Sequence, residues 1–263
     1  MADEPRPEIK IDAKGKSTVQ IEHADRQTPS PFGTGPVTAD VFKLGKLKSL
    51  PNWVVALAIK QRLEDALTEI RAAGVIVTSS GGIRDLGAKT GAGRSDTSFH
   101  YTGRAIDLYI YGGMNDPDTD PYVVTADPDI GTWRVFARTT DTSVAPSTLV
   151  GLKKKFVPKP KDSKLSEFVK LSEVETTGNF IDLTALFAKH NFQRIPAQDN
   201  FTKSANARHY PSAEWWHFQQ EDDLVPGKTT FGSLLLKVRT EAELEGTGPG
   251  ALRNKVWDGK AFR

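Results

Sequence analysis

The chain has 263 residues, of which 38% are hydrophobic, and this is enough to build one globular domain with a sizeable core. Lysine and arginine together number 35 against 33 acidic residues, so the net charge of +2 gives no reason to expect a partner nucleic acid. The chain has no cysteine, which excludes disulfides and thiolate metal sites, so a metal ion would need imidazole and carboxylate ligands.

The N-terminal part of the chain shows neither a membrane span nor a secretory signal. The sequence MADEPRPEIK is polar and rich in proline and lacks the apolar core of a signal peptide. No apolar run anywhere reaches the roughly 18 residues of a membrane-spanning helix. We expect residues 1–40 to form an extended N-terminal segment, with a small hairpin around a glycine turn within 9–23.

Residues 52–73 are predicted to form a long helix, because apolar residues recur at steps of three or four. This stripe consists of Val55, Ile59, Leu63, Leu67 and Ile70. Asn52 is a candidate cap at the start of the helix, and Gly74 ends it. The β-branched stretch 75–80 then predicts a strand, and the turn that follows leaves Arg84 at the end of that strand.

The segment 104–111 is predicted to be a strand in which Asp107 faces away from the aliphatic side chains. Residues 121–126 and 132–140 predict a hairpin, and 167–174 predicts a further strand. The basic run LKKKFVPKPK at 152–161 is interpreted as a solvated loop or hairpin tip, or alternatively as a segment attracted to an anionic polymer such as a cell wall.

Residues 179–190 predict a helix with Asp182 as its cap and His190 near its C-terminal end. The aromatic stretch 215–219 predicts another strand. The order of helix, strands, helix and strand predicts an α+β fold, with a largely antiparallel central sheet flanked by helices.

Two short motifs carry the candidate chemistry, SFHYTGRAID at 98–107 and EWWHF at 214–218, although each alone arises easily by chance. His100, Asp107 and His217 supply two imidazoles and one carboxylate, the donor set of a Zn²⁺ site that keeps one position open for water. Such a centre keeps a net charge of about +1 and lowers the pKa of water at the metal. The alternative interpretation is that the two histidines are satisfied core residues.

Glu214 lies three residues before His217, and on an ideal strand these two side chains would face opposite ways. We therefore expect Glu214 in the loop at the entry to the strand, where it can act as general base and then as general acid. The alternative is a surface ion pair between Glu214 and Arg208.

The pattern S-x-H-x-x-G-x-A-x-D followed by E-W-W-H-F resembles the zinc D-Ala-D-Ala peptidases, which include D,D-dipeptidases and D,D-carboxypeptidases of the vancomycin-resistance type. These share a fold with lysostaphin-type peptidases and the hedgehog signalling domain, and the resemblance covers roughly residues 50–220. It implies a hedgehog-like fold, a Zn²⁺ cofactor and hydrolysis of peptide bonds next to D-amino acids in peptidoglycan. It also implies that Arg84 stabilises the tetrahedral oxyanion, with a structural ion pair to Asp85 or Asp96 as the alternative.

Three further residues are candidates for contacting substrate. Ser98 is expected to contact substrate or support the metal ligands, unless it is a plain turn residue. His209 is close in sequence to Glu214 and is expected to touch substrate or orient the site. Of the two adjacent tryptophans one is expected in the core, and Trp215 is expected to wall the pocket.

The zinc peptidase domain is expected to span 41–240, with an inserted hairpin region at about 112–178 and a C-terminal tail at 241–263. This insertion favours a groove for a longer peptide, and therefore a D-Ala-D-Ala carboxypeptidase or a peptidoglycan endopeptidase of the phage-lysin or secreted-toxin type. We expect a monomer that acts on the bacterial cell wall, in the periplasm or outside the cell. A zinc-holding binding module without activity is the competing hypothesis.

Overall fold

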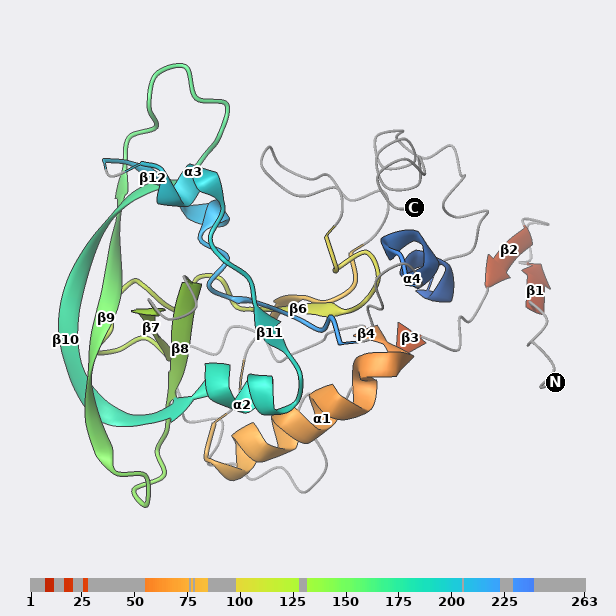
Figure 1. Cartoon of the computed structure of the whole chain (residues 1–263), viewed down its shortest axis with the longest axis horizontal. Coiled ribbons are helices and arrows are strands. Elements are labelled where there is room, and N and C mark those ends of the chain that lie inside the picture. The colour runs from red at the N-terminus through yellow and green to blue at the C-terminus, as the bar shows by residue number, and fades with distance from the viewer. Residues whose placement is uncertain are drawn as a thin grey trace.

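The computed structural model describes residues 8–11, 17–20, 26–27, 55–75, 77, 79–84, 98–127, 132–204, 206–222 and 229–238, the first three ranges by their backbone alone. The protein combines helices with antiparallel sheets, which confirms the predicted α+β class (Figure 1). The predicted N-terminal hairpin is also confirmed, because β1 (Glu8–Ile11) pairs with β2 (Ser17–Gln20) in antiparallel register.

A four-stranded sheet at the centre of the molecule carries Asp107 of the first motif and His217 of the second (Figure 1). Its strands, in spatial order, are β11 (Gln193–Arg194), β13 (His217–Gln219), β6 (Ala105–Leu108) and β5 (Ser79–Gly81). The strands predicted over 75–80, 104–111 and 215–219 therefore exist, but each is shorter than predicted. In the case of β13, the two tryptophans of EWWHF lie in the turn that precedes the strand.

A larger, five-stranded sheet is formed by the insertion between the two motifs together with β12. The strands are β12 (Arg208–His209), β10 (Phe168–Asp182), β8 (Thr132–Arg138) and β7 (Tyr122–Asp127), with β9 (Pro146–Val157) paired to β10. The predicted hairpin is confirmed as the antiparallel pair β7–β8, whose connection lies outside the described residues. The strand predicted at 167–174 is the first half of β10.

The basic run is only in part the solvated hairpin tip that its charge indicated, because residues 158–161 are exposed in the connection between β9 and β10. Residues 152–157 belong to β9, which pairs with β10 along its whole 12-residue length. Lys154 is buried, donates from Nζ to the carbonyl oxygen of Gly113 at 2.9 Å and to Oδ1 of Asn115 at 2.6 Å, and lies 4.5 Å from the Tyr210 ring centroid. The prediction is wrong for residues 152–157, because a lysine whose ammonium group finds acceptors can be buried within a strand.

The long helix α1 (Leu57–Ala72) begins later than predicted, because Val55 and Ala56 form the short strand β4, paired with β3 (Arg26–Gln27). Asn52, the predicted cap, lies outside the described residues, and Ala56 occupies the cap position without a side-chain bond. The end of the helix is confirmed at Gly74, whose φ of 76° favours glycine.

The second helix, α2 (Leu183–Lys189), is capped by Asp182 as predicted, because its Oδ1 accepts a 2.9 Å hydrogen bond from Ala185 N. The predicted start at residue 179 is wrong, since 179–182 complete β10. The remaining helical elements are α3 (Asp199–Thr202), the 3₁₀ turn η2 (Tyr210–Ser212) and α4 (Phe231–Val238). Among the described helices, none has both the length and the hydropathy needed to cross a bilayer.

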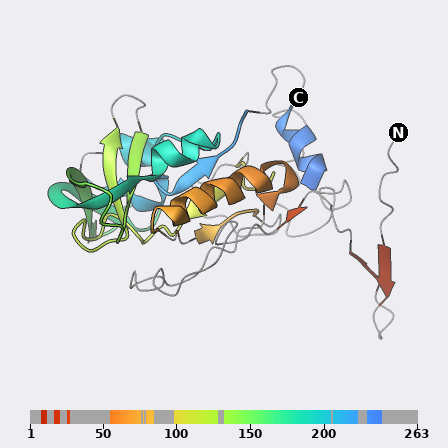
Figure 2. The ribbon, with the colours of Figure 1, turned by 90° about the horizontal axis from the view of Figure 1, so that it is seen from below.

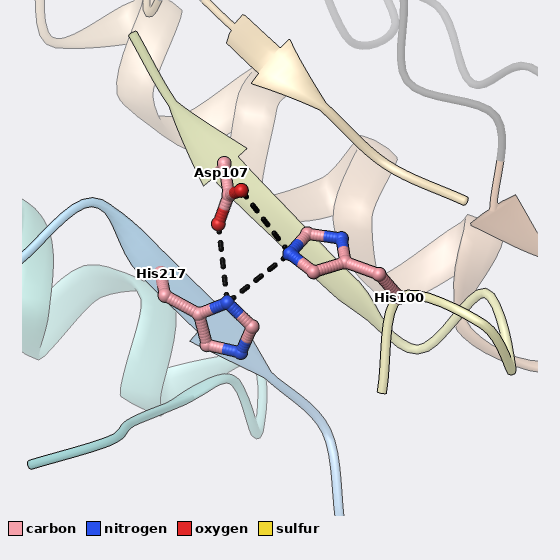
Figure 3. Close-up of side chains that lie close together, drawn as sticks. All are labelled: His100, Asp107 and His217. Carbon is pink, nitrogen blue, oxygen red and sulfur yellow. Dashed lines mark hydrogen bonds and ion pairs between the residues drawn. The ribbon is translucent and has the colours of Figure 1, made fainter. Parts of the chain in front are cut away.

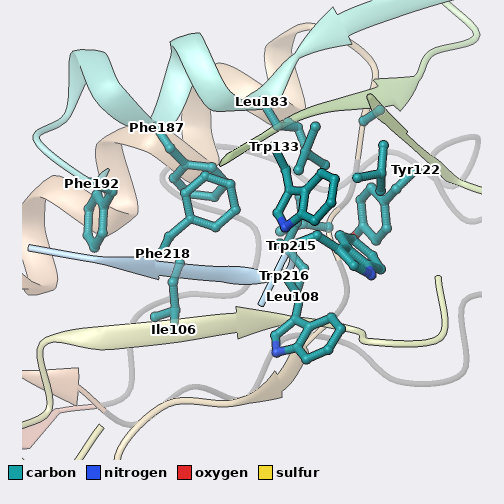
Figure 4. Packing of buried hydrophobic residues seen from close by; sticks show 14 of the residues in the cluster. Ile106, Leu108, Tyr122, Trp133, Leu183, Phe187, Phe192, Trp215, Trp216 and Phe218 are labelled. Carbon is teal, nitrogen blue, oxygen red and sulfur yellow. The ribbon is translucent and has the colours of Figure 1, made fainter. Parts of the chain in front are cut away.

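The hydrophobic core is formed by the central sheet, by helices α1 and α2, and by residues of the larger sheet such as Val135 and Val169. The two helices lie beside the central sheet (Figures 1 and 2). Phe218 of β13 and Ile106 of β6 are paired across the sheet and both point into this core, where the Phe187 ring of α2 lies 4.6 Å from that of Phe218 (Figure 4). Strand alternation therefore turns the neighbouring pair, His217 and Asp107, to the opposite face. One face of the β6–β13 ladder is core and the other carries the candidate site.

Candidate metal centre

His100, Asp107 and His217 meet on the face of the central sheet that points away from the core (Figure 3). Asp107 and His217 are directly opposite on β6 and β13, and their Oδ1 and Nδ1 atoms are 3.1 Å apart. Nε2 of His100 lies 3.1 Å from Asp107 Oδ2 and 3.2 Å from His217 Nδ1. The predicted convergence of the three residues from the two motifs is therefore confirmed.

His100 is brought to the site by a tight turn at 98–103 that runs into β6. Gly103 has a φ of 69° and donates a 3.2 Å hydrogen bond to the carbonyl oxygen of His100. A Cβ atom at this position would lie 2.7 Å from Ala56 N, which donates to the carbonyl oxygen of Gly103 at 2.9 Å. The glycine of the first motif is thus required both by its backbone angle and by its contact with the start of α1.

The two imidazoles are held so that each presents a ring nitrogen to the group. Nδ1 of His100 lies 2.6 Å from the carbonyl oxygen of Gly82, which can only accept, so this nitrogen carries a proton. Nε2 of His217 is 2.9 Å from Oε1 of Gln219 and donates in the same way. When the rings are neutral, Nε2 of His100 and Nδ1 of His217 therefore direct lone pairs toward each other and toward Asp107.

Three acceptors within hydrogen-bond distance of one another need a cation among them. The candidate ligand atoms all lie within 4.8 Å of one another, both histidines are buried, and Asp107 is partly buried. Burial by itself raises the pKa of Asp107, but the charges and hydrogen bonds of His100 and His217 in their protonated forms outweigh this effect and hold the pKa well below its usual range. The carboxylate is ionised at neutral pH. His100, Asp107 and His217, which together we call the metal group, could therefore hold a metal ion.

Glu214 lies in the turn before β13, as its spacing from His217 predicted. Its φ is 57°, a left-handed conformation that breaks strand alternation just before the candidate ligand His217. The carbonyl oxygen of Glu214 accepts a 3.2 Å hydrogen bond from His217 N, and its Oε1 accepts a 2.5 Å hydrogen bond from Gln198 Nε2. The role of Glu214 in proton transfer remains a prediction.

Arg84 follows β5 and runs beside the first motif. Its backbone N–H donates a 3.0 Å hydrogen bond to the carbonyl oxygen of His100, and its guanidinium carbon lies 5.3 Å from the Tyr101 ring centroid. Asp85 and Asp96, its alternative partners, lie outside the described residues. Arg84 is therefore next to the metal group along the backbone, and its oxyanion role stays a prediction.

The residues predicted to contact substrate have other surroundings. Trp215 is fully buried, and its Nε1 donates to the Tyr210 hydroxyl at 3.1 Å, so the prediction that it walls the pocket is wrong. His209 is buried in β12, and its described partners are Ser212, with Nδ1 and Oγ 2.8 Å apart, and the ring of Phe168, not the metal group. The carbonyl oxygen of Ser98 accepts from Tyr101 N at 3.0 Å, as expected of a turn residue, and its Oγ accepts from the backbone N–H of His100 at 3.4 Å.

Sequence reasoning missed four residues that support the site. Gln219 could have been found, because it lies two positions after His217 and so shares its face of the strand. The carbonyl oxygen of Gly82 carries no side-chain signal at all. Arg194 and Gln198 contact the Glu214 turn through pairings between distant parts of the chain, which no local pattern reveals.

Comparison of the chain with family models, with curated proteins and with solved structures finds no match. A functional assignment therefore depends on the two motifs and on the geometry of the residues that they bring together. Both bear on the same few side chains, and those side chains define the chemistry proposed below.

Proposed function

We propose that the chain is a zinc-dependent peptidase that hydrolyses peptidoglycan stem peptides, with a hedgehog/D,D-peptidase-like fold. The observation that carries this proposal is the convergence of two oriented imidazoles and one ionised carboxylate on a partly enclosed face of the sheet. Two histidines and a carboxylate form a donor set of catalytic zinc sites, in which the protein leaves a coordination position open. The family that the motifs resemble supplies the substrate class.

The residues divide the chemistry among them. When bound, Zn²⁺ supplies Lewis acidity to the scissile carbonyl group and to the attacking water. Glu214 accepts the proton of that water and returns it to the leaving amine. Arg84, on the segment bonded to His100, places positive charge where the oxyanion develops. Gly82 and Gln219 keep both imidazoles in the orientation that ligation needs.

The substrate we favour is a stem peptide ending in D-Ala-D-Ala, which a carboxypeptidase shortens by one residue. The second candidate is an endopeptidase, favoured by the size of the insertion that builds the larger sheet, β7 to β10. Either reaction takes place on the bacterial cell wall, in the periplasm or outside the cell. The presence of Glu214 in the turn before His217 speaks against a module that only binds zinc, because zinc binding alone does not require it.

Digestion of purified muropeptides tests the proposal. We expect the zinc-loaded protein to release one D-Ala or to cleave within the stem, and the product masses decide between these. In Glu214→Ala we expect kcat to fall about 10²- to 10⁴-fold, the usual contribution of a general base, with zinc retained. Glu167→Ala is the matched control, because Glu167 has the same φ of 57° and lies outside the metal group. Full activity in Glu214→Ala would contradict the mechanism.

A further inference from the structure

The turn 214–217 places both Glu214 and the ligand His217, and its conformation requires support from outside the turn. Glu214 adopts a φ of 57°, which is disfavoured for a residue with a Cβ atom and persists only where surrounding contacts impose it. One contact from outside reaches the preceding 3₁₀ turn η2, because Gln198 N donates a 2.9 Å hydrogen bond to the carbonyl oxygen of Ser212. The segment 193–198 therefore lies against the turn.

Arg194, at the end of β11, holds the backbone of this turn through one guanidinium group. Nη2 donates to the carbonyl oxygen of Glu214 at 3.0 Å, and Nη1 donates to that of His217 at 3.0 Å and also to that of Trp215. The guanidinium carbon lies 4.8 Å from the Phe218 ring centroid. Three carbonyl groups in four consecutive residues thus share one planar donor group, which a lysine ammonium cannot reproduce.

The charge of Arg194 interacts with the carboxylates of Glu214 and Asp107. Its Nε is shielded from solvent, and burial lowers the pKa of Arg194 to about 9, while the carboxylates of Glu214 and Asp107 act in the opposite direction. The guanidinium is therefore charged at neutral pH. The negative charges of the two carboxylates offset part of the effect of burial.

Gln198 acts on the side chain of the turn rather than on its backbone. Its Nε2 donates to Glu214 Oε1 at 2.5 Å, while its own backbone is fixed to Ser212. We propose that Arg194 and Gln198 are positioning residues: Arg194 fixes the turn so that His217 presents its nitrogen to the metal group, and Gln198 aims the Glu214 carboxylate. The role of Gln198 depends on the proposed function, whereas the role of Arg194 in metal binding does not.

The Arg194 half is tested on metal-free protein by competition for Zn²⁺ with a chromogenic chelator. We expect the Kd for Zn²⁺ to rise about tenfold to hundredfold in Arg194→Met, the usual effect of losing a residue that orients a metal ligand. Arg194→Lys should bind Zn²⁺ almost as weakly as Arg194→Met, because an ammonium group cannot donate to several carbonyl groups in the geometry of a planar guanidinium. Arg208→Met is the control: that guanidinium also stacks on a ring, Phe201, at 5.3 Å and donates to a carbonyl oxygen, but outside the turn.

The Gln198 half is tested by steady-state kinetics on muropeptides. We expect Gln198→Met to lower kcat about tenfold to hundredfold, because a small misplacement of a catalytic group costs this much, while KM and the Kd for Zn²⁺ change less than twofold. Gln193→Met is the control, because Gln193 is an exposed glutamine within the same segment 193–198. A residue needed only for folding would lower the melting temperature and leave kcat per folded molecule unchanged.

Amide hydrogen exchange across 213–219 gives a readout that needs neither metal nor activity. We expect faster exchange of these amides in both Arg194 variants than in Arg208→Met. Wild-type exchange together with wild-type zinc affinity in Arg194→Met would overturn the assignment of Arg194. An unchanged kcat in Gln198→Met would overturn that of Gln198. If the wild type bound zinc but cleaved no muropeptide, the proposed function would fail while the Arg194 result would still stand.

Discussion

Zinc should stabilise the folded protein measurably, because three acceptors face one another in its absence. Asp107, His100 and His217 are placed by the fold itself, two of them directly opposite on paired strands, and the unfolded chain has no such group. A ligand that binds only the folded state raises the free energy of unfolding by RT ln(1 + [L]/Kd). The prediction is tested by adding zinc to chelator-treated protein and measuring its thermal unfolding.

The expected magnitude follows from this relation. At a free zinc concentration one hundred times Kd, the stabilisation is about 2.7 kcal/mol. Domains of about 150–250 residues shift by about 2–4 °C for each kcal/mol. The described residues form a domain of this size, so zinc should raise the melting temperature by about 5–11 °C.

Asp107→Asn keeps the size of the side chain and removes its charge. A unit charge about 4 Å away contributes about 4 kcal/mol at an effective dielectric constant of 20, and about 2.7 kcal/mol already corresponds to a hundredfold change in affinity. A Kd weakened by that hundredfold leaves only about 0.4 kcal/mol at the same zinc concentration. The melting temperature should then rise by no more than about 1–2 °C.

The assay is differential scanning calorimetry with and without zinc on the wild type, Asp107→Asn and Asp127→Asn. Asp127 is a buried strand carboxylate of the other sheet, 3.5 Å from Arg134, so its substitution changes basal stability without touching the metal group. We expect Asp127→Asn to retain the wild-type zinc shift. The reasoning would be refuted if zinc did not change the melting temperature of the wild type, or if Asp107→Asn showed the same zinc-induced rise as the wild type.

Three further predictions concern stability. In metal-free protein, Asp107 has a folded-state pKa below its unfolded value of about 3.9. Its ionised carboxylate therefore stabilises the fold above that pH, and this contribution is lost as the pH falls. Urea titrations should show that the free energy of unfolding falls more steeply toward acid pH in wild type than in Asp107→Asn. Lys154 gives a slope of the same sign at high pH, because burial lowers its pKa to about 8 and the unfolded chain holds more protons between about pH 8 and 10. Stability should therefore rise with pH in this range, and Lys154→Met should remove that rise. Gly74→Ala should cost about 2 kcal/mol in urea unfolding, with unchanged zinc affinity, because the φ is 76° and the new Cβ would lie 2.8 Å from Thr139 Oγ1.

The elements that could be predicted from the sequence are those whose signal is local. The apolar stripe of α1 and the Asp182 cap of α2 each arise from residues within one or two turns of a helix, and the structure confirms both. The hairpin β7–β8 is likewise a contact between neighbours in the chain. Boundaries failed where a local tendency met a distant strand, as at Val55–Ala56, which pair with Arg26–Gln27 instead of extending α1.

Burial of single side chains was the least predictable property. Lys154 lies within a run of three lysines, yet it is buried because Gly113 and Asn115 provide acceptors from a distant loop. Trp215 was expected at the pocket, but the Tyr210 hydroxyl satisfies its indole N–H inside the core. In both cases the deciding partner is far away in the sequence or belongs to another element, so composition and periodicity contain no information about it.

The metal group could be predicted because its residues belong to two short motifs, at 98–107 and 214–218, in which the spacing of the side chains is informative. A spacing of three between Glu214 and His217 cannot place both side chains on one face of a strand, and the chain resolves this conflict by a left-handed residue at Glu214. The ligand consequently lies on the rigid ladder opposite Asp107, while the carboxylate of Glu214 lies on a turn that Arg194 and Gln198 hold in place. This division agrees with the roles that we propose, because the ladder fixes the metal ligand, while Arg194 and Gln198 keep the general base in place as the proton passes from a water molecule to a leaving amine.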